Sequence, residues 1–539
     1  MATSSAFASN RIEPVTEKPE ERRVIFASSL GTVFEWYDFY IYATLAPFFA
    51  ALFFPPGNAT AALMASFATY AAGFLVRPFG ALVFGRVGDL VGRKYTFLVT
   101  IIVMGLSTAA VGFLPTYATI GVFSPTILVL LRLLQGLALG GEYGGAATYV
   151  AEHAPDSKRG LHTSWIQTTA TLGFFVSLLI IGGCRLEMSE ASFKSWGWRI
   201  PFLVSLILLV ISVYIRLKLN ESPIFLRMKA EGKGSKAPVA ESFGKWPNLK
   251  IVLLALFGAT AGQGVVWYTG QFYALFFLTG TLKIDWKIAY TILAVALAMG
   301  TGLFIFFGWL SDKIGRKKIM MAGCLLAAAT YFPLYKAMMH FGNPALEAFA
   351  ADTPIALTAT DCQMHFFPNP TTKYSECDRV QDFLSKKSLS YTTTEGAAGA
   401  KPITSIKGTV IEGWDEKKLG ATLKTLGYPA TADPAQVNQL MLILIVLIQV
   451  VYVTMVYGPI AAFLVELFPT RIRYTSMSLP YHIGNGWFGG MLPLTATALV
   501  AANGDIYAGL WYPVVVAAIT LVLGTIFIRE TKDHKIQVV

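Results

Sequence analysis

Long apolar stretches recur along almost the whole chain, and short polar breaks separate them. A run of about 20 apolar residues spans the hydrocarbon core of a bilayer as an α-helix. We place such runs at 24–54, 61–84, 95–114, 126–150, 161–183 and 199–217, and then at 250–280, 288–310, 318–340, 438–464, 475–501 and 508–528. The pattern predicts an all-α integral membrane protein with twelve transmembrane helices, six on each side of a polar linker at 218–248.

The same short polar motifs occur in both halves of the chain. Gly85–Lys94 and Gly308–Lys317 each place an aspartate four residues after a glycine and close on Gly-Arg-Lys. Two further pairs of motifs end the fourth and tenth helices and follow the sixth and twelfth: 152–159 with 466–473, and 220–223 with 529–532. Corresponding motifs predict two pseudo-symmetric six-helix bundles, at 24–217 and at 249–340 with 438–530.

The spacing of these motifs locates an insertion. The stretch from Asp312 to Glu466 is far longer than its counterpart in the first half, and the surplus matches the polar segment 341–437. This segment lies between the ninth and tenth helices. We expect either a small ordered cap that contains a helix at 415–426, or a disordered segment, given its Thr, Ala, Gly and Lys content.

Lysine and arginine mark one side of the membrane. They gather in one set of loops and tails, whereas the opposite short loops at 55–60, 115–125 and 502–507 contain neither. By the positive-inside rule, the tails 1–23 and 531–539 and the central linker are expected to be cytosolic. The insertion is then periplasmic, where an oxidising compartment favours a disulfide between Cys362 and Cys377 over two unpaired thiols.

Composition agrees with a membrane protein. Hydrophobic residues make up 54% of the chain and charged residues 14%, against roughly a quarter charged in soluble domains. The net charge of +11 then follows from the positive-inside rule, and no nucleic-acid partner is expected. The first 23 residues lack a short apolar segment before a cleavage site, so we interpret them as a tail and not as a signal peptide.

Charged side chains inside predicted helices are costly and therefore suggest function. Glu35 and Asp38 share one face of the first helix, where two buried carboxyls raise each other's affinity for a proton. Glu142 of the fourth helix is a further proton-coupling candidate, and so is His482, whose imidazole titrates near neutral pH. The alternative for each is a structural role, which for the carboxylates means an ion pair with a neighbouring helix.

Two arginines and one aromatic helix are candidates for substrate contact. Arg77 needs either a carboxylate partner within the protein or an anionic substrate, which its planar fork fits. Arg199 either steers anions or anchors the helix at the membrane interface beside two tryptophans. The seventh helix and the break in the tenth supply aromatic faces and polar tips, which either line a substrate site or pack against neighbours: Trp267, Tyr268, Gln271, Tyr273 and Tyr457.

The repeated charged motifs lie at the expected cytosolic ends of helices. There a carboxylate can meet a helix N-terminus or an arginine of the other bundle. Such contacts break and re-form as the bundles rock, so we interpret them as gate latches and not as substrate ligands. The predicted gating residues are Asp89, Arg93, Asp312, Arg316, Glu152, Glu466 and Arg471.

The doubled Gly-Arg-Lys loops resemble the signature of the major facilitator superfamily. Its metabolite:H+ symporter family is similar in the motifs Glu35–Phe39, Arg77–Gly80, Gly141–Gly144, Trp196–Phe202 and Tyr481–Trp487. The resemblance implies a cavity lined by helices one, four, seven and ten, alternating access, and proton-driven uptake across a bacterial inner membrane. Members move proline, betaine, 2-oxoglutarate, citrate or shikimate, and the insertion departs from their short loop.

We therefore expect a monomeric, proton-coupled symporter that imports a small organic acid or zwitterion and needs no cofactor besides the proton gradient. The nearest alternative is a sugar:H+ symporter, because Asn220–Pro223 and Gly458–Pro459 also resemble that family, although the first helix does not. A non-transporting receptor that binds ligands with its insertion is a further alternative. The sequence shows no metal-spaced His cluster, activated nucleophile motif or phosphate loop, which argues against an enzyme and a bound metal.

Overall fold

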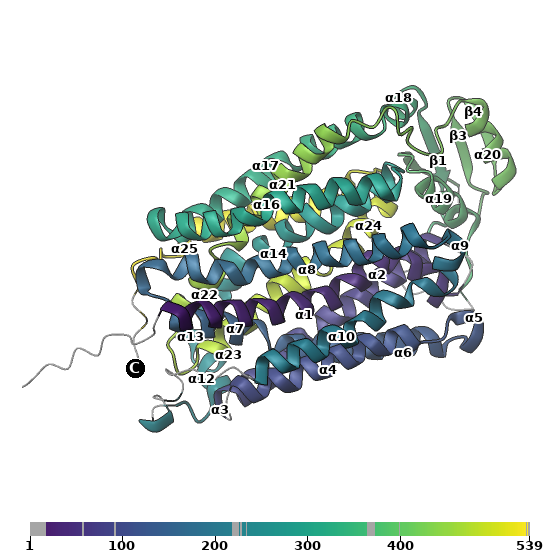
Figure 1. Cartoon of the computed structure of the whole chain (residues 1–539). Helices are drawn as coiled ribbons and strands as arrows, with labels where there is room; N and C mark the ends of the chain where they lie inside the picture. Colours follow the sequence, from purple (N-terminus) through teal and green to yellow (C-terminus); the bar gives the residue numbers. More distant parts are fainter. Residues whose placement is uncertain are drawn as a thin grey trace, which may run out of the picture.

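The twelve predicted spans all fall on helices that run side by side along one common direction (Figure 1). The computed structural model describes residues 18–55, 59–90, 93–217, 226, 229–232, 234–363, 372–397, 399–534 and 536. Within this part, nine helices or joined helices are long and apolar enough to cross a membrane. Exposed side chains such as Val210 and Val522 cover their outer faces, as expected where lipid replaces water.

The first bundle contains six spans, two of which are broken in the middle. Its helices are α1 (Lys18–Phe53), α2 (Ala59–Leu75) with α3 (Arg77–Leu90), α4 (Arg93–Phe113), α6 (Phe123–Gly140) with α7 (Tyr143–His153), α8 (Arg159–Glu187) and α10 (Arg199–Leu217). The α2–α3 break precedes Pro78, and the α6–α7 break falls at Gly140–Gly141, because proline and glycine both weaken a helix interior.

The second bundle repeats this arrangement. Its first rod joins α13 (Trp246–Ala255), η3 (Leu256–Thr260), α14 (Ala261–Tyr268), η4 (Thr269–Tyr273), α15 (Ala274–Phe276) and η5 (Phe277–Thr281). The others are α16 (Trp286–Ile314), α17 (Arg316–Gly342), α21 (Gln439–Tyr457) with α22 (Ile460–Leu467), α23 (Arg473–His482) with η6 (Ile483–Gly489) and α24 (Leu492–Asn503), and η7 (Ala508–Leu510) with α25 (Trp511–Phe527). The α21–α22 break falls at the Gly458–Pro459 pair.

The insertion forms an ordered α/β cap. It contains α18 (Pro344–Asp352), β1 (Ile355–Ala359), α19 (Glu376–Lys386), β2 (Thr392–Glu395), β3 (Ile403–Ile406), β4 (Thr409–Glu412) and α20 (Glu416–Thr425). The strand order is β2-β1-β3-β4; β1 and β2 are parallel, and the other pairs are antiparallel. Leu357, Ile406 and Leu419 are fully buried in its core, and a disulfide joins Cys362 to Cys377.

The sheet is a feature that the sequence pattern did not indicate. The helix predicted at 415–426 corresponds to α20, but the strands have only four or five residues. In β2 every side chain is exposed, so the strand lacks the alternation of apolar and polar positions by which a half-buried strand is recognised. The membrane part is helical as predicted, and the mixed structure is confined to the cap.

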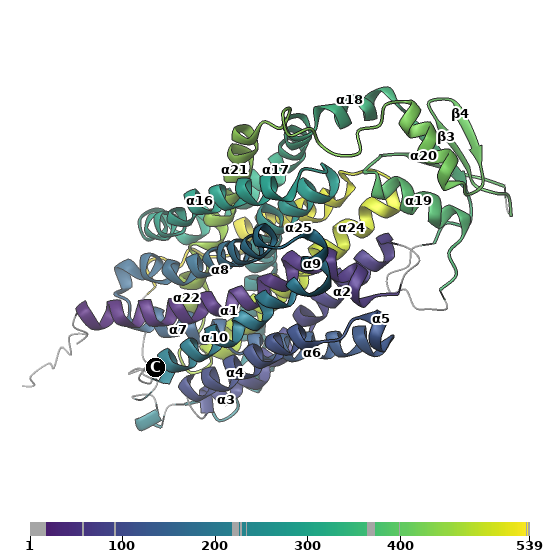
Figure 2. The ribbon, with the colours of Figure 1, turned by 45° about the vertical axis from the view of Figure 1, so that its right-hand side comes forward.

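The cap and the charged loops lie at opposite ends of the molecule (Figure 2). The cap covers one end, which we call the insert end. The other end contains α3, the short linker helix α12 (Pro238–Phe243), the start of α1 and the last described residues of the chain. We call it the basic end, because exposed lysines such as Lys158, Lys313 and Lys318 lie there.

Candidate transport pathway

A charged contact joins the two bundles at the basic end. Asp312 of α16 accepts hydrogen bonds from the backbone N–H groups of Gly160 and Leu161, both at 2.9 Å. These N–H groups begin α8 of the other bundle, where a carboxylate also meets the positive end of the helix dipole. Gly308 allows the helices to approach, since a Cβ there would lie 2.4 Å from the Cβ of Ser164. The aspartate of the second motif therefore bridges the bundles.

Glu466 is the centre of a second cross-bundle contact. Its Oε1 accepts hydrogen bonds from Arg316 Nη2 at 3.1 Å and from Arg159 Nη1 at 2.9 Å. Its Oε2 accepts one from the Thr531 hydroxyl at 2.7 Å, and Arg316 also donates to Asp312 at 2.6 Å. Of these residues, only Arg159 belongs to the first bundle. Its bond to Glu466 therefore links the first bundle to α16, α17 and α22 of the second.

Two further ion pairs flank this network. Glu152 at the end of α7 lies 3.4 Å from Arg473 Nη1 at the start of α23, and both side chains are nearly inaccessible to solvent. Arg471 instead pairs with Glu241 of α12 at 2.6 Å. Glu152 therefore forms another contact between bundles, whereas Arg471 holds the central linker against the second bundle.

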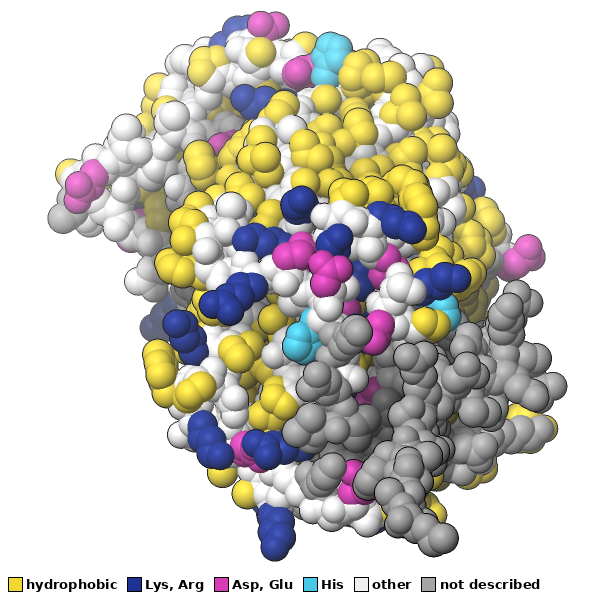
Figure 3. Space-filling view, turned by 90° about the vertical axis from the view of Figure 1, so that its left-hand side faces the viewer, with side chains coloured by type: hydrophobic (Ala, Val, Ile, Leu, Met, Phe, Trp, Pro, Cys, Tyr) yellow, Lys and Arg dark blue, Asp and Glu magenta, His cyan; other side chains and the backbone are white. Residues whose placement is uncertain are grey.

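Of the predicted gating residues of the second half, Asp312, Arg316 and Glu466 thus share one network at the basic end, and Arg471 lies outside it. Figure 3 looks onto this end and shows Lys and Arg side chains spread across it, with acidic side chains between them. The side chains of Asp89 and Arg93 lie outside the described residues, so their role stays a prediction. Sequence reasoning omitted Arg159 and Arg473 from the gate, although both lie in the repeated motifs at 152–159 and 466–473.

Aromatic side chains fill the interface between the bundles deeper inside the molecule. Trp36 and Tyr40 of α1 pack against Trp267 of α14, with ring centroids 5.9 and 5.7 Å apart. Phe174 of α8 packs against Phe272 of η4 at 4.7 Å. All five side chains are buried. We call this group the aromatic cluster; it brings the first, fifth and seventh spans together.

The predicted substrate wall lies in or beside this cluster. Tyr268 contacts Phe74 of the first bundle with ring centroids 5.6 Å apart, and the Gln271 amide donates to the Thr171 hydroxyl at 3.4 Å. The Tyr457 hydroxyl lies 2.7 Å from that of Tyr481. These side chains face the other bundle or the protein interior and not lipid, so packing against neighbouring helices stays the alternative to a substrate site.

Arg77 places a guanidinium at the same interface. The side chain begins α3 and is 2% exposed, and its Cζ lies 4.1 Å from the centroid of the Phe74 ring. Its charge is close enough to act on Tyr40, Tyr268 and His482. A buried cation surrounded by phenol groups and ring faces is suited to bind a carboxylate.

Arg199 lies apart from Arg77. It donates to the carbonyl oxygens of Ser195 and Leu114 at 3.2 and 3.3 Å, and it covers the Trp198 ring at 4.3 Å. These contacts fasten the start of α10 to the end of α4. The arrangement corresponds to the interfacial anchor, which was the alternative to anion steering.

The proton-coupling candidates have different surroundings. Asp38 is 4% exposed, and its Oδ1 has no hydrogen-bond partner in the described part of the chain. Glu142 forms an ion pair with Arg216 of α10, which corresponds to its structural alternative. His482 is buried with its ring edge against Tyr481. The side chain of Glu35 lies outside the described residues.

Arg132 is a second buried cation, to which sequence reasoning gave no role. It donates to the Gln135 side chain, and its guanidinium lies 4.3 Å from the ring centroid of Tyr42 and 5.4 Å from that of Tyr70. Its charge also acts on that of Arg77. The signal was present in the sequence as one arginine within the apolar run of the fourth helix.

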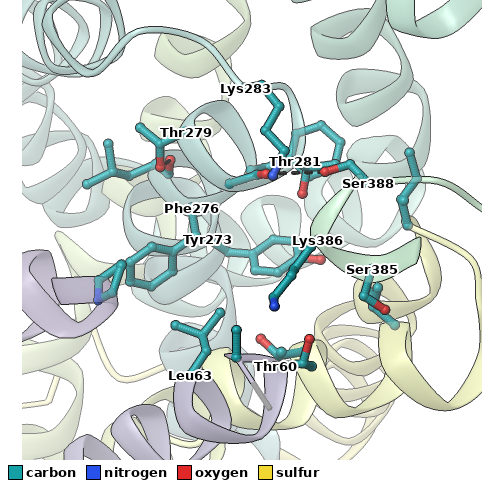
Figure 4. A pocket seen from close by; sticks show the side chains of 18 of the residues that line it. Thr60, Leu63, Tyr273, Phe276, Thr279, Thr281, Lys283, Ser385, Lys386 and Ser388 are labelled. Carbon is teal, nitrogen blue, oxygen red and sulfur yellow. Dashed lines mark hydrogen bonds between the residues drawn. The ribbon is translucent and has the colours of Figure 1, made fainter. Parts of the chain in front are cut away.

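A cavity of about 450 Å³ opens at the insert end, and we call it the vestibule. Residues of both bundles and of the cap line it, and Figure 4 shows Lys386 extending into it toward Thr60 and Tyr273. Tyr273 follows Phe272 of the aromatic cluster directly in sequence, although the side chains of the cluster do not themselves line the vestibule. Of the predicted substrate residues, Tyr273 lines it.

Known proteins resemble this chain over most of its membrane part. The family model for sugar (and other) transporters matches residues 24–251. The inner membrane metabolite transport protein YhjE of Escherichia coli is 38% identical over 330 residues, which cover 60% of this chain and 74% of that protein. The alpha-ketoglutarate permease of E. coli is 34% identical over 346 residues, which cover 64% of this chain and 78% of that protein.

Two further comparisons extend this similarity. The shikimate transporter of E. coli is 34% identical over 322 residues, which cover 59% of this chain and 72% of that protein. Among solved structures, the proton:xylose symporter XylE bound to 6-bromo-6-deoxy-D-glucose has a TM-score of 0.66 at 16% identity, over 97% of this chain and 98% of that one. At this identity, the likeness concerns the fold.

Proposed function

This chain belongs to the major facilitator superfamily and is a membrane transporter of metabolites, not an enzyme; from that premise we propose that it is a proton-coupled symporter that imports small organic acids or zwitterions. The observation that carries the proposal is the contrast between the two ends. Charged contacts join the bundles at the basic end, while the vestibule opens at the insert end. That asymmetry is expected of one state in an alternating-access cycle.

The substrate class follows from the buried charge between the bundles. Arg77 presents a planar guanidinium among aromatic rings, and this geometry suits a carboxylate better than an uncharged hydroxyl compound. The names of similar proteins agree, because 2-oxoglutarate, shikimate, proline and betaine all carry a carboxylate. We propose that Arg77 binds this group and that Trp267, Tyr268, Gln271, Tyr273 and Tyr457 select the rest of the molecule.

Asp38 is the best-placed proton carrier among the described candidates. Burial in a low-dielectric interior favours the neutral, protonated form of a carboxylic acid. Asp38 lies on α1 directly after Tyr37 and two residues before Tyr40 of the aromatic cluster. We propose that Asp38 binds a proton when the insert end is open and releases it when the basic end is open.

The orientation follows from the charge distribution. We propose that the basic end faces the cytosol, with both termini there, and that the cap faces the periplasm of a bacterial inner membrane. The disulfide of the cap fits an oxidising compartment. We further propose that the protein works as a monomer and that the proton gradient is its only energy source.

Uptake by purified protein in proteoliposomes tests this proposal. Radiolabelled 2-oxoglutarate, shikimate and proline are offered with the vesicle interior more alkaline than the outside. We expect accumulation of one of them that stops when a protonophore collapses the gradient. Unchanged uptake after the collapse would contradict proton coupling. Competition by xylose or glucose but not by carboxylates would instead favour sugar transport, to which the fold of XylE is also suited.

A further inference from the structure

The cap covers the vestibule and forms hydrogen bonds with both bundles. Asp382 of α19 accepts a hydrogen bond from the Thr60 backbone N–H at the start of α2, at 2.7 Å. On the side of the second bundle, the Tyr391 N–H donates to the Gly504 carbonyl at 2.8 Å, and the Ser388 hydroxyl donates to the Gly280 carbonyl at 3.2 Å. A solute that enters from the insert end through the vestibule therefore passes side chains of the cap.

Three basic side chains line the vestibule, and two of them already have acidic partners. Arg185 of α8 lies 3.2 Å from Glu190, and Lys386 of α19 lies 3.1 Å from Asp382. Lys283, in the turn between η5 and α16, forms no ion pair within the described residues. The vestibule therefore holds an uncompensated positive charge, which favours an anionic occupant.

The position of Lys283 is fixed by its backbone. Its φ of +56° lies in the left-handed region, which residues other than glycine adopt rarely. Its carbonyl oxygen accepts a hydrogen bond from the Ala432 N–H of the cap at 3.1 Å. The lysine is thus held where the cap and the membrane part meet, and its side chain lies near those of Thr281 and Ser388 (Figure 4).

The protonation of Lys283 responds to pH near neutrality. Burial and, to a lesser extent, the nearby charge of Lys387 together lower the pKa of Lys283 to about 8. The amine is therefore charged below that pH and neutral above it. Its surroundings contain two compensated cations, Arg185 and Lys386, and the phenol of Tyr391, whose pKa burial raises to about 12. Tyr273 and Tyr290 also line the space, and Asp505 lies near Tyr273.

The size and polar lining of the vestibule suit a small metabolite. Its volume of about 450 Å³ falls in the range of small-molecule sites. Thr60, Thr281 and Ser385 supply hydroxyl groups, and Tyr273 and Trp286 supply aromatic surface. Trp286 also supports Arg185, whose Cζ lies 3.9 Å from one of its ring centroids.

We propose that the vestibule is a binding site for small organic anions, where Lys283 pairs with the carboxylate beside the ion-paired Lys386 and Arg185. This site binds the substrate before the substrate reaches Arg77. The cap contributes residues to the lining, so the vestibule is a binding site and not only an open entrance. The inference rests on the proposed function in one respect, namely that the cargo is an organic anion.

Quenching of Trp286 fluorescence tests the site without any transport. The intact protein in lipid nanodiscs is titrated with iodide, an anion, and with acrylamide, which is neutral; the Trp286→Phe variant supplies the background from the other tryptophans. Lys283→Met should lower the quenching constant for iodide about threefold, since the attraction of one charge is lost. The quenching constant for acrylamide should be unchanged. The control Lys417→Met, an exposed lysine on α20, should change neither constant.

The pH dependence separates the charge of Lys283 from a change in shape. In the wild type, the iodide constant should fall between pH 7 and 9, as the amine becomes neutral. Lys283→Arg should keep a high iodide constant at pH 9, because guanidinium stays charged. Equal iodide constants in the wild type and in Lys283→Met, or an equal fall in Lys417→Met, would overturn the proposed site.

Uptake kinetics separate the two proposals. With 2-oxoglutarate as the probe, Lys283→Met should raise KM about five- to tenfold at an unchanged kcat, as the loss of one ion pair predicts. If no carboxylate is taken up but iodide quenching depends on Lys283, the proposed function is overturned and the anion site stands. If uptake proceeds with unchanged KM and unchanged quenching in Lys283→Met, the site is overturned and the proposed function stands.

Discussion

At the scale of single residues, the buried charges have different surroundings. Glu142 is paired with Arg216, and Arg316 lies between Asp312 and Glu466, so these charges are satisfied within the protein. Arg77 lies among aromatic rings at the interface of the bundles. Asp38 keeps one carboxyl oxygen unpartnered in the described structure. Side chains in such positions are suited to bind a substrate or a proton.

Replacing Arg77 tests its role as the carboxylate ligand. Arg77→Lys keeps the charge but loses the second parallel hydrogen bond, which costs about 1.5–3 kcal/mol and thus about ten- to hundredfold in kcat/KM. The matched control is Arg199→Lys, which should stay within twofold of the wild type because Arg199 binds backbone carbonyls. Initial rates of 2-oxoglutarate uptake measure both. Equal losses in the two variants would contradict the assignment.

Replacing Asp38 tests coupling separately from binding. Asp38→Asn keeps the shape but cannot gain or lose a proton, so uphill uptake driven by a pH gradient should disappear. Exchange of labelled for unlabelled substrate across vesicles at equal pH should continue, because it needs no net proton movement. Retention of gradient-driven accumulation in Asp38→Asn would exclude Asp38 as the sole carrier.

The residue patterns identified the charged positions but not most of their partners. Asp312 and Glu466 were recognisable because their motifs are repeated, and Arg77 because an arginine stood out in an apolar run. The partner of Glu142 was not predictable, since Arg216 is far away in sequence and only the tertiary fold brings the two side chains together. Such contacts depend on the tertiary fold and leave no local pattern.

At the scale of elements, two carboxylates meet helix N-termini at opposite ends of the molecule. Asp312 of α16 binds the first turn of α8 at the basic end. Asp382 of the cap binds the first turn of α2 at the insert end. Each aspartate adds a favourable interaction with the helix dipole. The first aspartate belongs to a motif that is repeated in both halves of the sequence, and the second contact exists only because of the cap.

The contact at the basic end predicts how its loss shifts the conformation. Asp312→Asn removes the charge that faces the α8 N-terminus and Arg316, so the population with an open basic end should rise about tenfold or more. Spin labels at K158C and K318C, with Cys184 and Cys324 replaced by serine, report this as longer distances. Asp285→Asn is the control, since the Asp285 carboxylate caps the N-terminus of α16 inside one bundle. A similar shift in the control would contradict the latch.

The disulfide of the cap predicts a gain in local stability. It closes a loop with a sequence separation of 15 residues, for which chain entropy gives about 3 kcal/mol at 25 °C. The Cys362→Ser/Cys377→Ser variant should therefore expose the cap to proteolysis much faster, while the membrane part stays intact. Cys184→Ser is the control. Equal proteolysis rates would show that packing alone holds the cap.

At the scale of the whole molecule, the arrangement of the two bundles was predictable and the vestibule was not. Apolar runs of membrane length and repeated motifs defined the helices, their order and the insertion. Residues of α1, α2, α8, η5 and α19 line the vestibule. Its shape therefore depends on how the cap packs against both bundles. The strands of the cap have only four or five residues, and β2 lacks the alternation of buried and exposed positions that would have revealed the sheet.

The most direct test of the account measures both ends of the molecule in the same conditions. One sample is labelled at K158C and K318C across the basic end, and another at A59C and N503C across the insert end. On addition of 2-oxoglutarate at acidic pH, the account predicts longer distances at the basic end and shorter ones at the insert end, with neither change when the substrate or the protons are omitted. Distances that change in the same direction at both ends, or that respond equally to xylose, would contradict proton-coupled alternating access for organic acids.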